Sequence, residues 1–140
     1  MKYSRRNVGL LLPALAAAKA AGQDLALPSK CYRYEDLPVR ESGQNRSRAI
    51  LNGKTRTAFG VELHETELAP GLAPHAPHHH VHEEMILIRE GTLEVTIATE
   101  TIRLGPGSIA YVASNQEHGL RNAGTIRARY FVMALGRATA

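Results

Sequence analysis

Histidines are concentrated in one short segment of the chain. Five of the seven histidines lie between residues 71 and 91, and Glu83 and Glu84 follow them directly. Imidazole nitrogens and carboxylate oxygens together bind borderline divalent metal ions. The segment is therefore a candidate metal site. The alternative is a surface histidine cluster that binds metal only opportunistically.

The spacing within this segment suits a β-strand. Side chains of an extended chain alternate between two faces, so His78 and His80 point to the same side. Glu84 has the same parity and joins them if the strand continues or bends. Parity admits His82 equally well, so spacing alone leaves the ligand set open.

The same residues resemble the first motif of the cupin family. That motif consists of a glycine, the sequence H-x-H, three or four residues, a glutamate, six residues and a second glycine. His78, His80, Glu84 and Gly91 match it in full, while Gly71 lies one residue farther upstream than usual. A pair at positions 80 and 82 would need a glutamate at position 86 or 87, where the chain has isoleucine and leucine.

A second stretch resembles the second cupin motif. Gly107 begins it, His118 follows a strand and a turn, and Asn122 ends it. Three positions depart from the usual residues, and all lie in or before the turn: Ser108, Ala113 and Asn115. Asparagine tolerates the left-handed conformation that glycine supplies there. The resemblance covers residues 46–135.

The resemblance implies a ligand set of three imidazoles and one carboxylate, on His78, His80, Glu84 and His118. Such a set leaves one or two positions open on an octahedral ion. It implies one divalent metal ion per chain, with manganese, iron, nickel or cobalt favoured and zinc possible.

The other polar residues near these motifs are expected to have lesser roles. We expect the remaining histidines of the segment at the rim and Glu83 in solvent: His75, His79 and His82. His64 is expected to be a strand residue, and parity does not tell whether it faces the pocket. Asn122 is expected to be structural, and Tyr111 to lie in the core.

Short strands separated by turn residues must position the site. Alternation of apolar and polar residues and turn-forming sequences predict eight strands: 46–51 as an edge strand, 61–68, 85–89, 92–99, 101–104, 109–112, 119–122 and 126–133. The last of these is expected to belong to the core. An all-β sandwich or barrel follows. The resemblance specifies it as the cupin double-stranded β-helix, a jelly-roll barrel.

Composition argues for a soluble globular domain and against nucleic-acid binding. The chain has 140 residues, of which 44% are hydrophobic and 5% aromatic, without tryptophan. Stacking on bases needs exposed rings, which are scarce here. Four of the 17 Lys and Arg residues lie within residues 1–23, which leaves 13 against 13 Asp and Glu. The net charge of +4 therefore belongs to the N-terminus.

The N-terminal segment has the order of an export signal. Arg5 and Arg6 precede an apolar run, and Ala18-Lys19-Ala20 offers a cleavage site. The paired arginines resemble the bacterial twin-arginine signal. The expected organisation is a cleaved signal at 1–21, an N-terminal extension or edge strand at 22–45 and the barrel at 46–135. A periplasmic or exported protein without stable membrane insertion follows, and an amphipathic first helix is the alternative.

The function expected from the resemblance is that of a small-molecule metalloenzyme, of the dioxygenase, decarboxylase or isomerase type. The alternative is a non-catalytic periplasmic module that binds a metal or a small ligand. No proton-transfer residue is identified by spacing. Cys31 is the single cysteine, so no internal disulfide forms. A homodimer is expected by analogy, because edge strands need covering.

Overall fold

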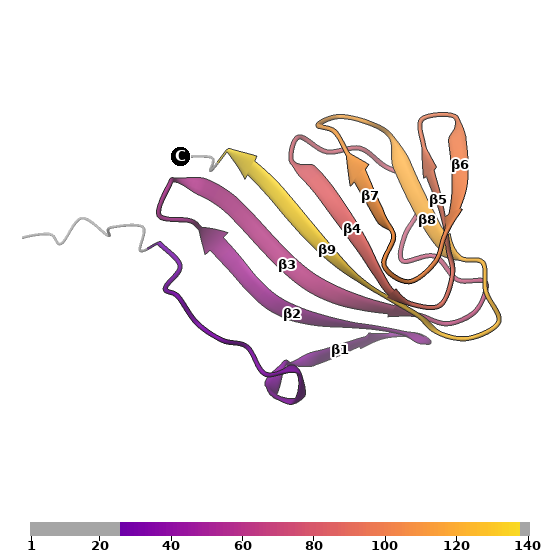
Figure 1. Ribbon diagram of the computed structural model, residues 1–140, viewed down its shortest axis with the longest axis horizontal. Helices are drawn as coiled ribbons and strands as arrows, with labels where there is room; N and C mark the ends of the chain where they lie inside the picture. Colours follow the sequence, from indigo (N-terminus) through magenta and orange to yellow (C-terminus); the bar gives the residue numbers. More distant parts are fainter. Residues whose placement is uncertain (1–25, 138–140) are drawn as a thin grey trace, which may run out of the picture.

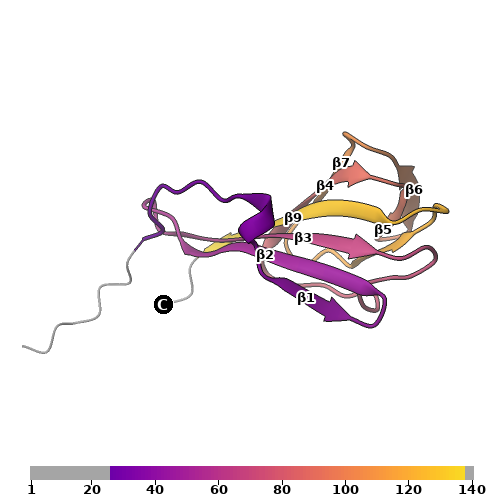
Figure 2. The ribbon, with the colours of Figure 1, turned by 90° about the horizontal axis from the view of Figure 1, so that it is seen from below.

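The computed structural model describes residues 26–137, which fold into two antiparallel sheets that face each other (Figures 1 and 2). The larger sheet has the strand order β1-β2-β3-β9-β4-β7, and the smaller has the order β6-β5-β8. The elements are η1 (Tyr34–Asp36), β1 (Val39–Ser42), β2 (Asn45–Lys54), β3 (Phe59–Leu68), β4 (Glu83–Glu90), β5 (Leu93–Ile97), β6 (Glu100–Leu104), β7 (Ile109–Val112), β8 (His118–Asn122) and β9 (Ala128–Arg137). In this part of the chain no helix is long and apolar enough to cross a bilayer.

The all-β jelly-roll prediction is confirmed, and each predicted strand is present: 109–112 has the bounds of β7, and the other strands have shifted ends. The prediction that residues 46–51 form an edge strand is wrong. They belong to β2, which pairs with β1 on one side and β3 on the other. The sequence did not show where β1 lies. All four of its residues are exposed, and they show no alternation of apolar and polar side chains that would indicate a strand. The predicted signal at 1–21 lies outside the described residues and stays a prediction.

The core lies between the two sheets and is built by the inward side chains of each strand. Its buried members alternate with outward residues along each strand, as two-residue periodicity requires: Leu68, Ile86, Ile88, Leu93, Val95, Ala110, Val112, Ala128, Tyr130 and Val132. The placement of Tyr111 in the core is wrong, because it points outward and is 54% exposed. The stretch 126–133 is core only at alternate positions, and Ile126 is exposed.

Two asparagines and their turns have the predicted structural roles. Asn115 has φ of 60°, the left-handed conformation expected where the motif usually has glycine. The side-chain nitrogen of buried Asn122 donates to the carbonyls of Leu68 and Ile126 at 3.0 and 2.7 Å, and its oxygen accepts from Gly124 N. Asn122 thereby joins three segments of the chain at one end of the barrel.

A buried charged cluster lies on the outer face of the larger sheet. Glu65 and Glu67 point outward from β3 and are buried by Arg48, Arg89 and Arg129. Burial alone would raise the pKa of Glu67, but Arg48 and Arg129 hold it below its ordinary value. The ring of η1's Tyr34 lies against Arg48 and Arg89, with 4.7 and 5.0 Å to their guanidinium carbons. This cluster fastens the N-terminal segment to the sheet.

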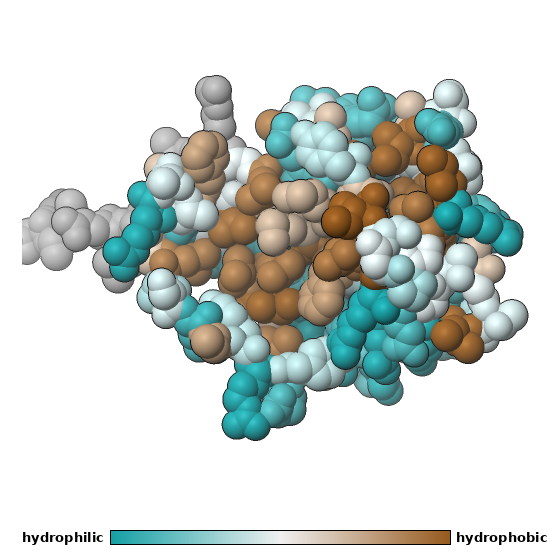
Figure 3. All heavy atoms as spheres, in the orientation of Figure 1, coloured by the Kyte–Doolittle hydropathy of each residue, from teal (hydrophilic) through white to brown (hydrophobic). Residues whose placement is uncertain are grey.

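The rest of that outer face is apolar. Outward residues of neighbouring strands form continuous rows, because the register pairs Leu63 with Met133 and Met133 with Met85. None of the outward apolar residues is buried: Leu51, Val61, Leu63, Met85, Leu87, Ile109, Tyr111, Phe131, Met133 and Leu135. Figure 3 shows apolar side chains gathered over β3, β9 and β4. Such a broad apolar surface is typical of an interface.

Candidate metal centre

The structure brings the four predicted ligands together at one end of the barrel. His78 forms an isolated antiparallel bridge with His118, the first residue of β8. The chain then bends at residues 81–82, and β4 begins at Glu83, so that Glu84 points inward. Nε2 of His118 lies 3.1 Å from Glu84 Oε2, and Nε2 of His80 lies 3.5 Å from Oε1. Nitrogen atoms of His78, His80 and His118 all lie within 4.8 Å of one another.

The loop before β8 holds His80 in place. The backbone N–H of Asn115 donates to the carbonyl of His80 at 2.7 Å, and the Ser114 hydroxyl donates to the carbonyl of Val81 at 2.6 Å. The left-handed conformation at Asn115 turns the chain at this point. The backbone N–H of Asn115 therefore reaches the carbonyl of His80, and His118 follows three residues later.

Hydrogen bonds define which nitrogen of two imidazoles is available. Nδ1 of His80 lies 2.8 Å from the carbonyl of His82, and Nδ1 of His118 lies 2.9 Å from the carbonyl of Gln116. A carbonyl only accepts, so both Nδ1 atoms carry the proton in the neutral rings. Each Nε2 therefore presents its lone pair to the centre of the cluster, as metal-binding histidines do.

This arrangement fits a cation. The lone pairs of His80 and His118 face the oxygens of Glu84, and acceptors facing acceptors repel unless a proton or metal ion lies between them. Two buried nitrogens in the cluster, His78 Nδ1 and His80 Nε2, also have no hydrogen-bond partner. Buried polar atoms normally find partners. Three imidazoles and a carboxylate suit a divalent ion.

The electrostatics favour neutral imidazoles. Burial lowers the pKa of His78, and the nearby rings of His75, His118 and His80 lower it further. Burial also lowers the pKa of His82, with a further contribution from His80. A metal binds the neutral ring, so these shifts prepare the nitrogens for coordination.

His82 lies closer to the cluster than a rim residue would. Its ring stacks on that of His80 at 3.6 Å between centroids, and its Nε2 lies 4.0 Å from Glu84 Oε1. His80, His82 and Glu84 form a second group with mutual distances within 4.8 Å. His82, which strand parity allowed as a ligand, therefore lies near the candidate metal centre in the structure. His75 is exposed and packs edge-on against His78, while His79 is exposed.

A cavity of about 230 Å³ inside the barrel adjoins Glu84 and His118. His64 lines it from β3, and Thr66 and Tyr130 line its deeper part. Sequence parity did not settle where His64 points. The sequence signals conflict here: His64 has the same parity as the core residue Leu68, but Val61 and Leu63, which are also apolar, have the opposite parity. Burial raises the pKa of the Tyr130 phenol well above its usual value, so that it stays neutral.

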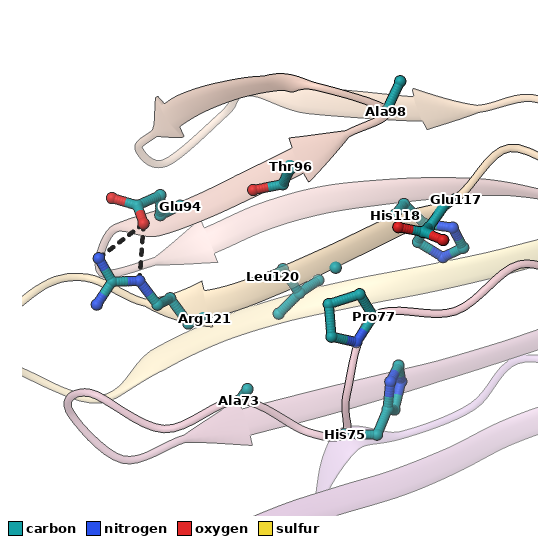
Figure 4. A pocket seen from close by; sticks show the side chains of 11 residues that line it. Ala73, His75, Pro77, Glu94, Thr96, Ala98, Glu117, His118, Leu120 and Arg121 are labelled. Atoms are coloured by element: carbon teal, nitrogen blue, oxygen red, sulfur yellow. Dashed lines mark hydrogen bonds and ion pairs between the residues drawn. The ribbon is translucent and has the colours of Figure 1, made fainter.

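A second groove, of about 290 Å³, lies outside the barrel between the smaller sheet and the loop at residues 73–77. Figure 4 shows Glu94 and Arg121 paired at one end of it, with Pro77 and His75 on the opposite side. Nε of Arg121 donates to Glu94 at 2.7 Å. These two charges therefore satisfy each other.

Comparison with known proteins agrees with this geometry. Residues 64–134 match the cupin domain model, a span that includes all four predicted ligands. The polyketide synthase protein TcmJ of Streptomyces glaucescens is 28% identical over 107 residues, covering 76% of this chain and 71% of that protein.

Solved structures share the fold. KdgF from Halomonas sp. has a TM-score of 0.67 at 14% identity, covering 77% of this chain and 95% of that one. The polyketide cyclase RemF from Streptomyces resistomycificus has a TM-score of 0.62 at 21% identity, covering 81% and 87%. The matched domain, the two facing sheets and the His/Glu cluster together lead to one conclusion: the chain belongs to the cupin domain family.

Proposed function

We propose that this cupin is a metal-dependent enzyme that acts on a small oxygenated organic molecule bound in the inner cavity. The observation that carries the proposal is the arrangement of His78, His80, Glu84 and His118 beside that cavity. Glu84 comes from the larger sheet and His118 from the smaller, and both line the cavity. A small molecule in the cavity would therefore lie next to the ion.

The donor set favours one divalent ion per chain, with manganese, iron, nickel or cobalt preferred and zinc possible. When bound, such an ion supplies Lewis-acid or redox chemistry at its open positions. The residues of the chain position it: His80 and His118 through their hydrogen-bonded Nδ1 atoms, and Glu84 from the inner face of β4.

The names of similar proteins support an oxygen-rich substrate. TcmJ is described as a polyketide synthase protein and RemF as a polyketide cyclase, and polyketides are rich in carbonyl and hydroxyl groups. A predicted oxalate decarboxylase from Thermotoga maritima shares the fold at a TM-score of 0.63. A reaction of the dioxygenase, decarboxylase or isomerase type on such a molecule fits an open metal position beside a cavity of this size.

Elemental analysis tests the proposal first. Protein purified without a histidine tag is expected to carry about one equivalent of manganese, iron, nickel or cobalt per chain. Aromatic hydroxy-ketones and small keto acids are then screened for consumption, with and without dioxygen, using metal-stripped protein as the control. Stoichiometric metal without turnover of any compound would favour the non-catalytic binding module. Absence of stoichiometric metal after reconstitution would contradict the metalloenzyme and leave the module that binds a small ligand.

We also propose that the protein is a homodimer that joins through the outer apolar face of the larger sheet. The rows of apolar residues are continuous across β3, β9, β4 and β7 and at most half-buried, so they offer a second copy an apolar surface. An apolar face is complementary to itself without charge matching, and isologous dimers use such faces. Residues 26–38 cover the charged cluster through Tyr34 and lie along β2, where Leu27 packs over Gly53.

Leu87→Glu is expected to convert the dimer to a monomer, because a carboxylate in the apolar contact would be desolvated without a partner. Leu87 is 41% exposed, so the monomer accepts this change in solvent. Light scattering coupled to size exclusion gives the mass against the 15.2 kDa of one full chain. Ile126→Glu, in the loop between β8 and β9, is the matched control, because Ile126 is also exposed but lies outside the apolar face, and it should leave the dimer intact. A monomeric wild type would refute the proposed dimer.

A further inference from the structure

We propose that His64, oriented by Glu62, accepts the proton of a hydroxyl group on the small molecule bound in the inner cavity. The substrate class is then a single-ring phenol or enol. This inference rests on the proposed function and deepens it, because it assigns the proton-transfer residue that spacing alone did not reveal.

The register places His64 across the cavity from the metal ligands. On the inner face, Glu62 pairs with Ala134 and Ala134 with Glu84, while His64 pairs with Val132. Two strand spacings amount to about 10 Å between Glu62 and Glu84 at the backbone. His64, Glu84 and His118 all line the cavity, so a ligand in it would lie beside both the imidazole of His64 and the candidate metal centre.

The Glu62 carboxylate prepares the imidazole for this role. Its Oε1 lies 3.4 Å from Nδ1 of His64. A carboxylate at this position favours the proton on Nδ1 and stabilises the ring when it becomes charged, which leaves the lone pair of Nε2 for a ligand. The His64 side chain is 31% exposed, so it can afterwards exchange the proton with solvent.

The other titratable groups that line the cavity are committed elsewhere. Glu84 and His118 belong to the candidate metal centre, and Tyr130 stays a neutral phenol. His75 directs its Nδ1 to the carbonyl of Ala76 at 2.9 Å, and its ring packs on His78. Among the described residues that line the cavity, His64 is the basic group left for a substrate proton.

The remaining walls set the size and polarity of the ligand. Ile86, Leu120 and Val132 are apolar, and they favour a flat carbon skeleton over a charged chain. The volume of about 230 Å³ is below the range of roughly 300–1,000 Å³ typical of drug-sized ligands. One ring with oxygen substituents matches this space.

The proton step balances without a further reagent. The O–H bond of the ligand breaks, its electron pair stays on the oxygen, and the proton moves to Nε2 of His64. The imidazolium that results carries one positive charge, which faces the Glu62 carboxylate. The ligand becomes an anion in the same step, so the total charge of the cavity does not change.

Calorimetry with maltol tests this inference. Maltol is a single ring with one enolic hydroxyl beside a carbonyl, and it is mainly neutral at pH 7.5. Binding to cobalt-loaded full-length protein is measured in two buffers with different ionisation enthalpies, which gives the number of protons released to the buffer. The wild type is expected to release close to none. His64→Gln should release about one proton and bind maltol about tenfold more weakly, because a charge-assisted hydrogen bond is lost.

Control variants distinguish failure of the proposed role of His64 from failure of the proposed function. Glu62→Gln should weaken binding by a smaller factor, whereas exposed His79→Gln should behave as the wild type. Equal proton release by the wild type and His64→Gln, or a cobalt-loaded wild type that does not bind maltol, would overturn the role of His64. A wild type that retains no cobalt would overturn the proposed function as well. Cobalt content near one equivalent in His64→Gln shows that the metal centre itself is unaffected.

Discussion

Replacing His118 with alanine should reduce bound metal from about one equivalent per chain to less than about a tenth. Losing even a residue that supports a ligand costs about 10- to 100-fold in metal affinity, and losing the ligand itself should cost more. His118 is 4% exposed and arrives from a separate strand, so its loss removes the imidazole that β8 contributes to the cluster. Plasma emission spectrometry after dialysis measures the metal content.

The barrel should remain folded in this variant. The bridge between residues 78 and 118 is made by backbone atoms, at 2.9 and 3.0 Å, and alanine retains it. Circular dichroism should therefore show the strand content of the wild type. His79→Ala is the matched control, because this exposed histidine lies in the same segment but outside the cluster, and it should keep its metal.

Further variants distinguish the two possible ligand sets. His80→Ala should lose the metal in either case, because His80 belongs to both groups. His82→Ala should retain about one equivalent if the set is His78, His80, Glu84 and His118. Loss of metal in His82→Ala together with retention in His118→Ala would transfer the site to His80, His82 and Glu84. Full retention in both His80→Ala and His118→Ala would contradict the four-ligand set.

The sequence predicted the His/Glu cluster well where metal-binding side chains also share the strand parity that places them on one face. His78, His80 and Glu84 lie on one face because strand parity and the bend at residues 81–82 both direct them inward. The position of His118 followed from the resemblance, since no local pattern links it to ligands that are 34 to 40 positions away. His82 stayed ambiguous because a bend, unlike a straight strand, lets side chains of one parity approach from different directions.

Residues on strands that are apolar on both faces were harder to place. Tyr111 and Ile109 lie on β7, whose inward neighbours Ala110 and Val112 are just as apolar. All four residues of β7 are apolar, so the sequence does not show which face of the strand is buried. The prediction that Tyr111 lies in the core was wrong for this reason. The same lack of contrast conceals the outer apolar face on β4, β7 and β9. On β3 the contrast is reversed, because apolar Val61 and Leu63 face outward while polar Glu62 and His64 face inward.

Gly91→Ala should lower the free energy of unfolding by about 3 kcal/mol. Gly91 lies in the turn between β4 and β5 at φ of 78°, a conformation that costs alanine about 1 kcal/mol. A Cβ there would lie 2.8 Å from both Ala128 Cα and Arg127 O, and overpacking of this kind costs about 1–3 kcal/mol. Both obstacles are backbone atoms, so they cannot move aside as a side chain does. Urea unfolding of the metal-free protein measures the change.

Gly107→Ala separates strain from the clash in the same experiment. Gly107 has nearly the same conformation, with φ of 83°, but a Cβ there would have nothing within 4 Å. Its cost should therefore be the conformational part alone, about 1 kcal/mol. Metal-free protein is needed because a bound ion stabilises the folded state by mass action. Equal losses in the two variants would show that the start of β9 moves freely away from Gly91. The last glycine of the first motif would then be needed for its turn and not for the contact between β9 and the strand that carries Glu84.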